Sequence, residues 1–179
     1  ERELEIYYIK PGNLFLDHNT PCAKAKPIKV NDNPTNWFTT GKQRAMELNQ
    51  LDIILMRQDP PVTTDYYVAT YILEHAKQQG VLVVNHPRSL RDVNEKVYCT
   101  WFAEIMAPTL VSKHYETLLE FLNIHQDIIV KPLHSMGGDS IFRIRIGDSN
   151  TTTILESVSS RYQEFIIAQR SIPEISEVD

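Results

Sequence analysis

The sequence lacks the features that mark a secreted, zinc-binding or membrane protein. Its two cysteines, Cys22 and Cys99, are too few for a disulfide framework, and they have no CxxC or Cys/His zinc spacing. No apolar run approaches the ~20 residues that span a bilayer, and no signal peptide opens the chain. We therefore expect a cytoplasmic protein that does not associate with a membrane.

Positive charge is scarce as well. The chain has 18 Lys and Arg against 23 Asp and Glu, which gives a formal net charge of −5, and neither sign forms a long run. Nucleic-acid binding needs clustered Lys and Arg, so we expect no nucleic-acid partner. The six histidines have no metal-ligand spacing, and no nucleophilic triad or dyad stands above chance.

Hydrophobic residues are plentiful, at 42% of the 179 positions, and can bury a core in one domain or two small ones. The aliphatic runs at 51–56 and 81–85 are typical of buried strands. Between them a segment with helical periodicity, which places Val68, Ala69, Ile72, Leu73 and Ala76 on one face, ends at Gly80. Such a βαβ unit implies a parallel sheet. The first half is therefore predicted to be Rossmann-like, without a GxGxxG motif. Its opening residues look like a strand entered from a preceding element, so we expect the chain to begin partway into a domain.

The second half has a different pattern. Asn94 is a candidate N-cap for a helix to Ile105, whose apolar residues Val97, Trp101 and Ile105 recur at four-residue spacing on its expected inward face. Residues 127–133 and 141–146 are typical of an antiparallel hairpin with one solvent-facing side. The other expected elements are strands at 108–112 and 164–169 and helices at 113–125 and 152–158. These form a small α+β module, and we place the domain boundary between Arg88 and Asn94.

Lys131 and the glycines that follow it form the first candidate site. Lys131 ends an aliphatic strand and is either solvated or held against an anion. Gly137 and Gly138 let backbone N–H groups approach a phosphate, and Ser140 adds a hydroxyl donor, although the same glycines also suit a mobile hairpin tip. Because the loop joins two strands and lacks GxxxxGK[ST], a P-loop is excluded.

Two further segments could complete a nucleotide site. Lys96, near the start of the second helix, is by default a surface lysine, but it would help to neutralise a triphosphate if it converged with Lys131. Residues 168–173 leave a buried strand and end at a proline, so their backbone could be free of strand partners and pair with an adenine ring. The alternative is a plain strand end.

Polar residues also follow the two strands of the first half. Arg57 and Asp59 come after the strand at 51–56, at the end where open α/β sheets bind ligands. Arg57 could bind a substrate carboxylate through a bidentate pair, or it could only brace the proline-rich turn with Asp59. The same alternatives apply to Arg88 and its neighbours after the next strand.

Three segments are highly specific when taken together: MRQDPP (56–61), NHPRSLRDVNEK (85–96) and KPLHSMGGDSIFR (131–143). With the other elements they resemble bacterial glutathione synthetase, an ATP-grasp ligase, in order and spacing over nearly the whole chain from about Glu3. The resemblance implies an α/β fold with a Rossmann-like pre-ATP-grasp domain at 1–93, incomplete at its start. It implies the N-terminal ATP-grasp subdomain and hinge at 94–179, incomplete at its end and lacking the C-terminal ATP-grasp part.

The resemblance also implies a chemistry. The family joins γ-glutamylcysteine to glycine, converting ATP to ADP and phosphate through an acyl-phosphate intermediate, with Mg²⁺ or in its place Mn²⁺, in a cytoplasmic homo-oligomer that is often a tetramer. The family's metal ligands lie beyond Asp179, so we expect no metal ligand in this chain, assign it no catalytic residue and expect the 179 residues alone to be inactive. The alternatives are another ATP-grasp carboxylate–amine ligase and an ATP-binding module without turnover.

The resemblance extends to single residues. Lys96 and Lys131 match two family lysines that contact the phosphates and the base side of ATP, and the glycine loop matches the small loop that folds over the phosphates. The implied ATP-binding residues are Lys96, Lys131, Gly137, Gly138, Ser140, the hinge residues Gln169, Arg170, Ser171 and Ile172, and Asp179 near the ribose. Arg57, Asp59 and Arg88 are the implied substrate-binding residues. His134 and Ser135 depart from the family's usual Asp-Gly pair, and the hinge has QRSI where QNYL is usual.

Overall fold

The computed structural model describes residues 4–59 and 61–177, and the chain divides into two compact units, Glu1–Asp92 and Val93–Asp179. The first unit contains β1 (Ile6–Asp17), β2 (Thr20–Val30), β3 (Phe38–Thr40), β4 (Arg44–Glu47), the 3₁₀ helix η1 (Leu48–Gln50), β5 (Ile53–Leu55), α1 (Thr64–Gln78), β6 (Leu82–Val84) and α2 (Pro87–Asp92). The second contains α3 (Glu95–Tyr98), η2 (Cys99–Ile105), β7 (Thr109–Ser112), α4 (Tyr115–His125), β8 (Asp127–Pro132), β9 (Phe142–Arg145), α5 (Thr151–Val158), β10 (Ile166–Arg170) and η3 (Pro173–Glu177).

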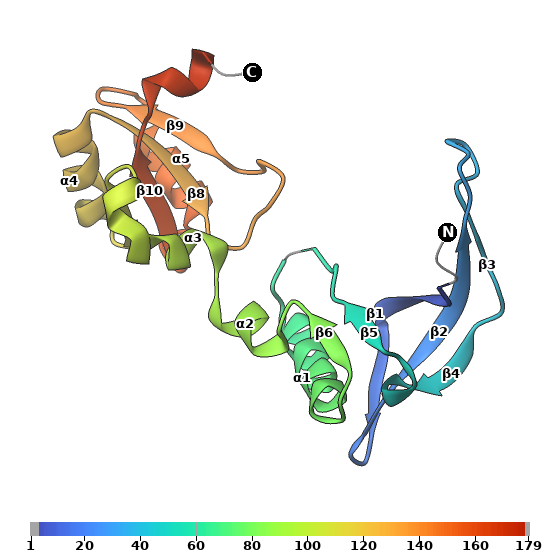
Figure 1. The fold of residues 1–179 in the computed structure, drawn as a ribbon. Helices are drawn as coiled ribbons and strands as arrows, with labels where there is room; N and C mark the ends of the chain where they lie inside the picture. The colour runs from blue at the N-terminus through green and yellow to red at the C-terminus, as the bar shows by residue number, and fades with distance from the viewer. Residues whose placement is uncertain (1–3, 60, 178–179) are drawn as a thin grey trace. The chain divides into compact units, whose positions relative to one another are not determined.

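In the first unit, β1 and β2 form a long antiparallel ribbon (Figure 1), and β3 and β4 both pair with β2. From the sequence alone only two short strands are expected here, at residues 4–9 and 26–30. The pairing shifts register between Ile9 and Leu14, where Pro11 and Gly12 lie. An irregularity of this kind lets one ribbon continue through residues that would otherwise end a strand.

The predicted βαβ unit is confirmed. β5 and β6 pair in parallel, with Ile53 opposite Leu82, and α1 connects them. The Thr63 side chain caps α1 by accepting a hydrogen bond from the Tyr66 N–H, and Gly80 follows the helix at a φ of +101°. Among the described residues the parallel sheet has only these two strands, and the other strands of the unit are antiparallel.

The inward face of α1 is formed by a stripe of small and aliphatic residues that packs on the strands of the first unit. It consists of Ala69, Ile72, Leu73 and Ala76, all of them buried, and the last three join Ala23, Leu48, Val81 and Val83 in one core. The prediction that Val68 shares this face is wrong, since Val68 is 48% exposed. Val68 lies just outside one edge of this stripe and is exposed. At the opposite edge Thr70 is buried, so the inward face includes Thr70 and not Val68.

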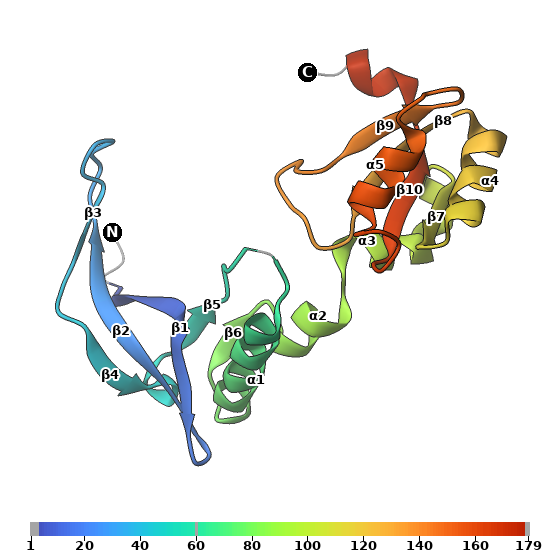
Figure 2. The same ribbon diagram turned by 180° about the vertical axis from the view of Figure 1, so that it is seen from behind.

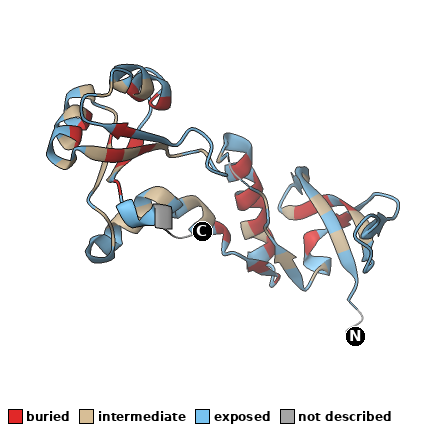
Figure 3. Cartoon of the chain, turned by 90° about the horizontal axis from the view of Figure 1, so that it is seen from above, coloured by how far each residue is buried: buried red, intermediate tan, exposed pale blue. Residues whose placement is uncertain are grey.

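The second unit is an antiparallel sheet covered on one face by two helices. Its strand order is β7-β10-β8-β9, and α4 and α5 lie beside the sheet (Figure 2). The shared core consists of Leu118, Leu122, Ile128, Val130, Ile144, Leu155, Val158, Ile166 and Ala168. Both units therefore contain their own buried residues, as Figure 3 shows. The predicted β8–β9 hairpin is confirmed, with Ile144 buried between the exposed Arg143 and Arg145.

The single helix predicted for residues 94–105 is wrong. α3 ends at Tyr98 and continues as the 3₁₀ segment η2, which is interrupted at Phe102 (φ −115°, ψ 45°). Its supposed inward residues are exposed, Trp101 by 72% and Ile105 by 81%. Residues 99–102 have only modest helix propensity, and no core residue of the second unit covers this stripe among those described. Short 3₁₀ turns result. None of the described helices is long and apolar enough to cross a membrane.

Candidate functional site

Lys131 lies on the face of β8 that the helices do not cover. Strand alternation places Ile128 and Val130 in the core, where both are fully buried, and sends Lys131 to the other side. There it is half-buried, and its Nζ donates to Oε1 of Gln169 at 3.0 Å. The ammonium is therefore held by a neutral amide, which leaves its charge uncompensated by that partner.

Lys96 contacts the beginning of the loop that contains the two glycines. Oδ1 of Asn94 caps α3 by accepting hydrogen bonds from the N–H groups of Lys96 and Val97, at 3.0 and 3.1 Å. The Lys96 Nζ then donates to the backbone oxygen of Ser135 at 2.7 Å and lies 2.8 Å from Oε1 of Glu95. Only 16% of the Lys96 side chain is exposed, so it is not the ordinary surface lysine that was the default expectation.

Glu95 is the counterion of Lys96. Partial burial is the largest single effect on the pKa of Glu95 and raises it, but the hydrogen bond from Lys96, a backbone hydrogen bond and the charges of Lys96 and His134 together hold that pKa below its usual range. The Glu95 carboxylate is therefore charged at neutral pH. Since Glu95 itself is exposed, an incoming anion can compete with it for the ammonium group.

The loop between β8 and β9 is a turn in the left-handed region. Gly137, Gly138 and Ser140 have φ angles of +69°, +80° and +58°, and the Asp139 N–H donates to the Met136 oxygen at 3.3 Å. A Cβ on either glycine would meet no atom within 4 Å. The glycines are therefore required by backbone conformation and not by close packing. The loop joins two strands, as expected, and has no P-loop geometry.

The four predicted hinge residues lie at the end of β10, which includes Gln169 and Arg170, and directly after it, at Ser171 and Ile172. The expectation that their backbone is free is wrong at two positions, because the Arg170 N–H donates to the Pro108 oxygen and the Ser171 N–H donates to the Asp127 oxygen, both at 2.9 Å. The first bond continues the pairing of β10 with β7 to Pro108, the residue before β7. The second continues the pairing of β10 with β8 to Ser171, the residue after β10. Within the described residues, the Ile172 N–H has no acceptor and Ile172 is exposed. The first free donor of the segment is therefore Ile172.

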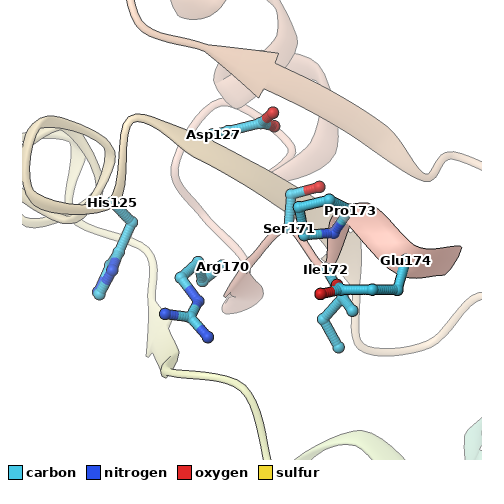
Figure 4. A pocket seen from close by; sticks show the side chains of 7 residues that line it. All are labelled: His125, Asp127, Arg170, Ser171, Ile172, Pro173 and Glu174. Carbon is cyan, nitrogen blue, oxygen red and sulfur yellow. The ribbon is translucent and has the colours of Figure 1, made fainter.

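An open hollow with a volume of about 410 Å³ lies beside this segment (Figure 4). Its lining residues are His125, Asp127, Arg170, Ser171, Ile172, Pro173 and Glu174. The side chains of His125 and Arg170 lie on one side of the strand and that of Asp127 on the other. Arg170 pairs with Ile128 in register and so shares the helix-covered side of the sheet. Neither Lys96 nor Lys131 is among the described lining residues, so this hollow is separate from both lysines.

The comparisons with known proteins identify one family. Residues 1–91 match the model for the prokaryotic glutathione synthetase N-terminal domain, and residues 95–179 match the model for the prokaryotic glutathione synthetase ATP-grasp domain. The chain belongs to the prokaryotic glutathione synthetase family. Its two matched regions join where the chain also divides into its two compact units.

Similar sequences and structures agree with this family. The chain is 42% identical to glutathione synthetases of Vibrio vulnificus and of Yersinia pestis over 178 residues, which is 99% of this chain and 56% of each relative. It thus spans about half the length of the curated relatives it matches. A crystal structure of the D-cycloserine synthetase DcsG has a TM-score of 0.56 at 13% identity, covering 73% of this chain and 47% of that one. A RimK domain protein ATP-grasp from Sphaerobacter thermophilus has a TM-score of 0.51 at 17% identity, covering 81% and 52%. The fold is therefore the mixed α/β fold of ATP-grasp proteins.

The family's implied substrate-binding residues lie in the first unit. β5 and β6 are parallel neighbours, so the segments after them leave the same edge of the sheet, and the Met56 N–H donates to the Val84 oxygen at 2.7 Å there. Arg57 and Asp59 are exposed after β5. Arg88 is exposed in α2 and pairs with Asp92 at 3.2 Å. The geometry thus brings Arg57 and Arg88 to one edge, with Arg88 braced by the carboxylate of its own helix.

The remaining predictions are those for the metal ligands and for the residue near the ribose of ATP. Among the described residues, no three His, Cys, Asp or Glu side chains are grouped so that they could hold a metal ion. Asp179, predicted near the ribose, lies outside the described residues. The family's metal chemistry therefore has no support from the part of the chain that the structure describes.

One residue of the site was missed by the sequence prediction. Asn94 was expected only as a helix cap, but its Nδ2 also donates to the Leu133 oxygen at 3.3 Å. It therefore connects the turn that carries Lys96 to the end of β8, two residues after Lys131. A polar cap residue two positions before a candidate phosphate lysine was the available signal, but the partner strand is 39 residues away in sequence.

Proposed function

We propose that the intact protein joins γ-glutamylcysteine to glycine with ATP, releasing ADP and phosphate. One observation carries the proposal. The Lys96 Nζ donates to the backbone oxygen of Ser135, four residues beyond Lys131, so a lysine from a distant part of the chain lies beside the loop that follows the strand of Lys131. Two positive charges beside a loop of left-handed glycines form a donor set for a polyphosphate.

The surrounding residues fit ATP in particular. Lys131 is held on the uncovered face of the sheet by Gln169, and Gln169 begins the hinge that ends at the free Ile172 N–H. An adenine ring presents a donor and an acceptor side by side, which a backbone segment of this kind can pair with. The proposed ATP-binding residues are Lys96, Lys131, Gly137, Gly138, Ser140, Gln169, Arg170, Ser171, Ile172 and Asp179.

The proposed reaction needs little covalent chemistry from the protein. The cysteinyl carboxylate attacks the γ-phosphate, and the glycine amine then displaces phosphate from the acyl phosphate. The described residues contribute charge neutralisation and positioning, which account for most of phosphoryl-transfer catalysis. We propose that Mg²⁺, or Mn²⁺ in its place, is held by residues other than the described ones, since those provide no ligand group.

Several finer points of the proposal have only the family in support. Arg57, Asp59 and Arg88 are proposed to bind the carboxylates of the substrates, because guanidinium groups pair with carboxylates in a bidentate manner. We further propose a cytoplasmic homo-oligomer, a tetramer, without nucleic-acid or membrane partners.

The proposal is tested with the intact protein in an assay for ADP release. We expect release that requires γ-glutamylcysteine and glycine together, with neither substrate sufficient alone. Lys131→Ala should weaken ATP binding by about 2 to 4 kcal/mol, because phosphate charge then stays unpaired in a partly desolvated site. Lys113→Ala is the matched control. It removes the same charge from a lysine of the same unit, whose ammonium lies 5.5 Å over the ring of Phe165.

Three results would contradict the proposal in different ways. A rate of ADP release that is the same with and without γ-glutamylcysteine and glycine would refute the proposed ligation. Release that accepts a different carboxylate and amine pair in preference would move the protein to another ATP-grasp ligase. An ATP dissociation constant unchanged by Lys131→Ala would remove Lys131 from the nucleotide site.

A further inference from the structure

Three side chains on adjacent strands lie on the sheet face opposite the helices. In register, Gln169 of β10 pairs with Thr109 of β7, and Lys131 of β8 pairs with Ile167, two residues before Gln169. Ala168, between these two positions of β10, belongs to the core on the helix-covered face. Thr109, Gln169 and Lys131 are therefore neighbours on one face, across three strands.

A continuous chain of hydrogen bonds connects them. The Lys131 Nζ donates to Oε1 of Gln169 at 3.0 Å, and Nε2 of Gln169 lies 3.1 Å from Oγ1 of Thr109. The Thr109 hydroxyl in turn donates to the backbone oxygen of Ala107 at 2.7 Å. All three side chains are half-buried.

Chemistry allows only one direction for this chain. A hydroxyl has a single proton, and that of Thr109 is used on the Ala107 oxygen, so Thr109 can only accept from the Gln169 amide. The NH₂ group of Gln169 must then face Thr109, and its carbonyl oxygen must face Lys131. The reverse amide orientation would set two donors, the NH₂ group and the ammonium, against each other.

The partner of Lys131 also differs in kind from that of Lys96. Lys96 is paired with the carboxylate of Glu95, whereas Lys131 is held by a neutral amide. An amide oxygen orients an ammonium without cancelling its charge, so the full charge remains for a phosphate. A lysine stem is flexible, and holding it in place before the ligand arrives lowers the entropy lost on binding.

We propose that Thr109 is a positioning residue for Lys131, acting through the amide of Gln169. Its hydroxyl determines that the carbonyl oxygen of the Gln169 amide faces the ammonium group, and it thereby determines the position of the charge of Lys131. The inference rests on the proposed function, since it takes Lys131 to be a residue that meets ATP. Thr109 itself touches neither Lys131 nor, in this proposal, the nucleotide.

The test measures ATP and adenosine dissociation constants for the intact protein by calorimetry. Thr109→Val keeps the shape and the strand preference but removes the hydroxyl, and it should weaken ATP binding roughly 3- to 10-fold, the net effect of one lost hydrogen bond. Adenosine, which has no phosphate, should bind as before. Thr109→Ser restores the hydroxyl and should bind ATP within about twofold of the wild type. Thr117→Val, at an exposed position of α4, is the control for the substitution itself.

A double-mutant cycle shows whether Thr109 acts through Lys131. In a Lys131→Met background, Thr109→Val should cause no further loss of ATP affinity, because the ammonium group that Thr109 positions is already absent. If Thr109→Val fails to fold, Thr109→Ala removes the same hydroxyl and takes its place.

The outcomes separate this inference from the proposed function. A wild-type protein that binds no ATP would overturn both. A wild type that binds ATP no more tightly than Thr109→Val would overturn the positioning role alone. Equal losses of ATP and adenosine affinity, or an undiminished loss in the Lys131→Met background, would also overturn it, because a merely structural role predicts both results.

Discussion

At the scale of single residues, Asp127 connects three segments of the second unit. Its carboxylate accepts hydrogen bonds from Arg143, at 2.9 Å to Nε and 2.7 Å to the terminal nitrogen, and from Arg145 at 3.3 Å, while its backbone oxygen accepts from Ser171. The hydrogen bond from Arg143 lowers the pKa of Asp127, partial burial opposes this, and Arg145 adds to the lowering. The start of β8 is thus bound to β9 by charge and to the hinge by its backbone.

This lowered pKa predicts a pH dependence of stability. An Asp with a folded-state pKa below its unfolded value of ~3.9 contributes stability above that pH and loses it as the pH falls through the folded-state pKa. Asp127→Asn should therefore lower the free energy of unfolding by up to about 1 kcal/mol near pH 7 and by progressively less below about pH 4. Urea midpoints from pH 3 to 7 measure the difference, with Glu120→Gln on the exposed side of α4 as control. A constant difference across this range would contradict the prediction.

At the scale of elements, the loop from Leu133 to Ile141 is held at its beginning and open at its tip. Asn94 and Lys96 bind the backbone oxygens of Leu133 and Ser135. Because both contacts go to main-chain atoms, the departures at His134 and Ser135 from the family's usual residues leave this anchor unchanged. Beyond it, the residues from Met136 to Ile141 are exposed, so the tip can move while the beginning stays in place.

A valine in this tip should harm function more than stability. Gly138→Val places a β-branched side chain at a φ of +80°, where it is strained although it has room. We expect a several-fold rise in the KM for ATP with a change in melting temperature of only a few degrees. Gly147→Val is the matched control, because Gly147 has a φ of +84° in another turn of the same unit. A large fall in melting temperature with intact activity would indicate a structural turn only.

At the scale of the whole molecule, the two units have separate hydrophobic cores. Leu73 belongs to the core of the first unit and Leu118 to that of the second, and both are almost fully buried. Each core is completed by residues of its own unit, with contributions from segments far apart in sequence. The units can therefore lose stability separately.

A pair of cavity substitutions checks this. Leu118→Ala should destabilise the second unit by about 2 to 5 kcal/mol and reduce amide protection there, while the amides of the first unit keep theirs. Leu73→Ala should have the converse effect and leave ATP binding less affected. Hydrogen exchange resolved by residue measures both, and uniform loss of protection after either substitution would show that the units unfold together.

Much of the fold was predictable from local pattern. The βαβ unit followed from two aliphatic runs around a helical segment, and the hairpin of β8 and β9 followed from strict alternation. The segment from Asn94 to Ile105 was mispredicted because its apolar residues are spaced as on one face of a helix. Whether such a segment forms a regular helix depends on a partner surface that buries this face. The described part of the second unit provides no such surface. The long β1–β2 ribbon was missed because its pairing continues across Pro11 and Gly12, and cross-strand hydrogen bonds of this kind leave no local signal.

The candidate site divides in the same way. The residue types were decided by the sequence itself: a lysine on a buried strand, glycines at positions that need a positive φ, a cap residue before Lys96, and motifs specific enough to imply a family. Only the tertiary structure decided that Lys96 reaches Ser135, that Gln169 holds Lys131, and that Thr109 orients Gln169. The physical reason is distance along the chain. Turn and strand preferences act over a few residues, whereas these contacts join positions 38 to 60 residues apart and exist only once the strands have paired.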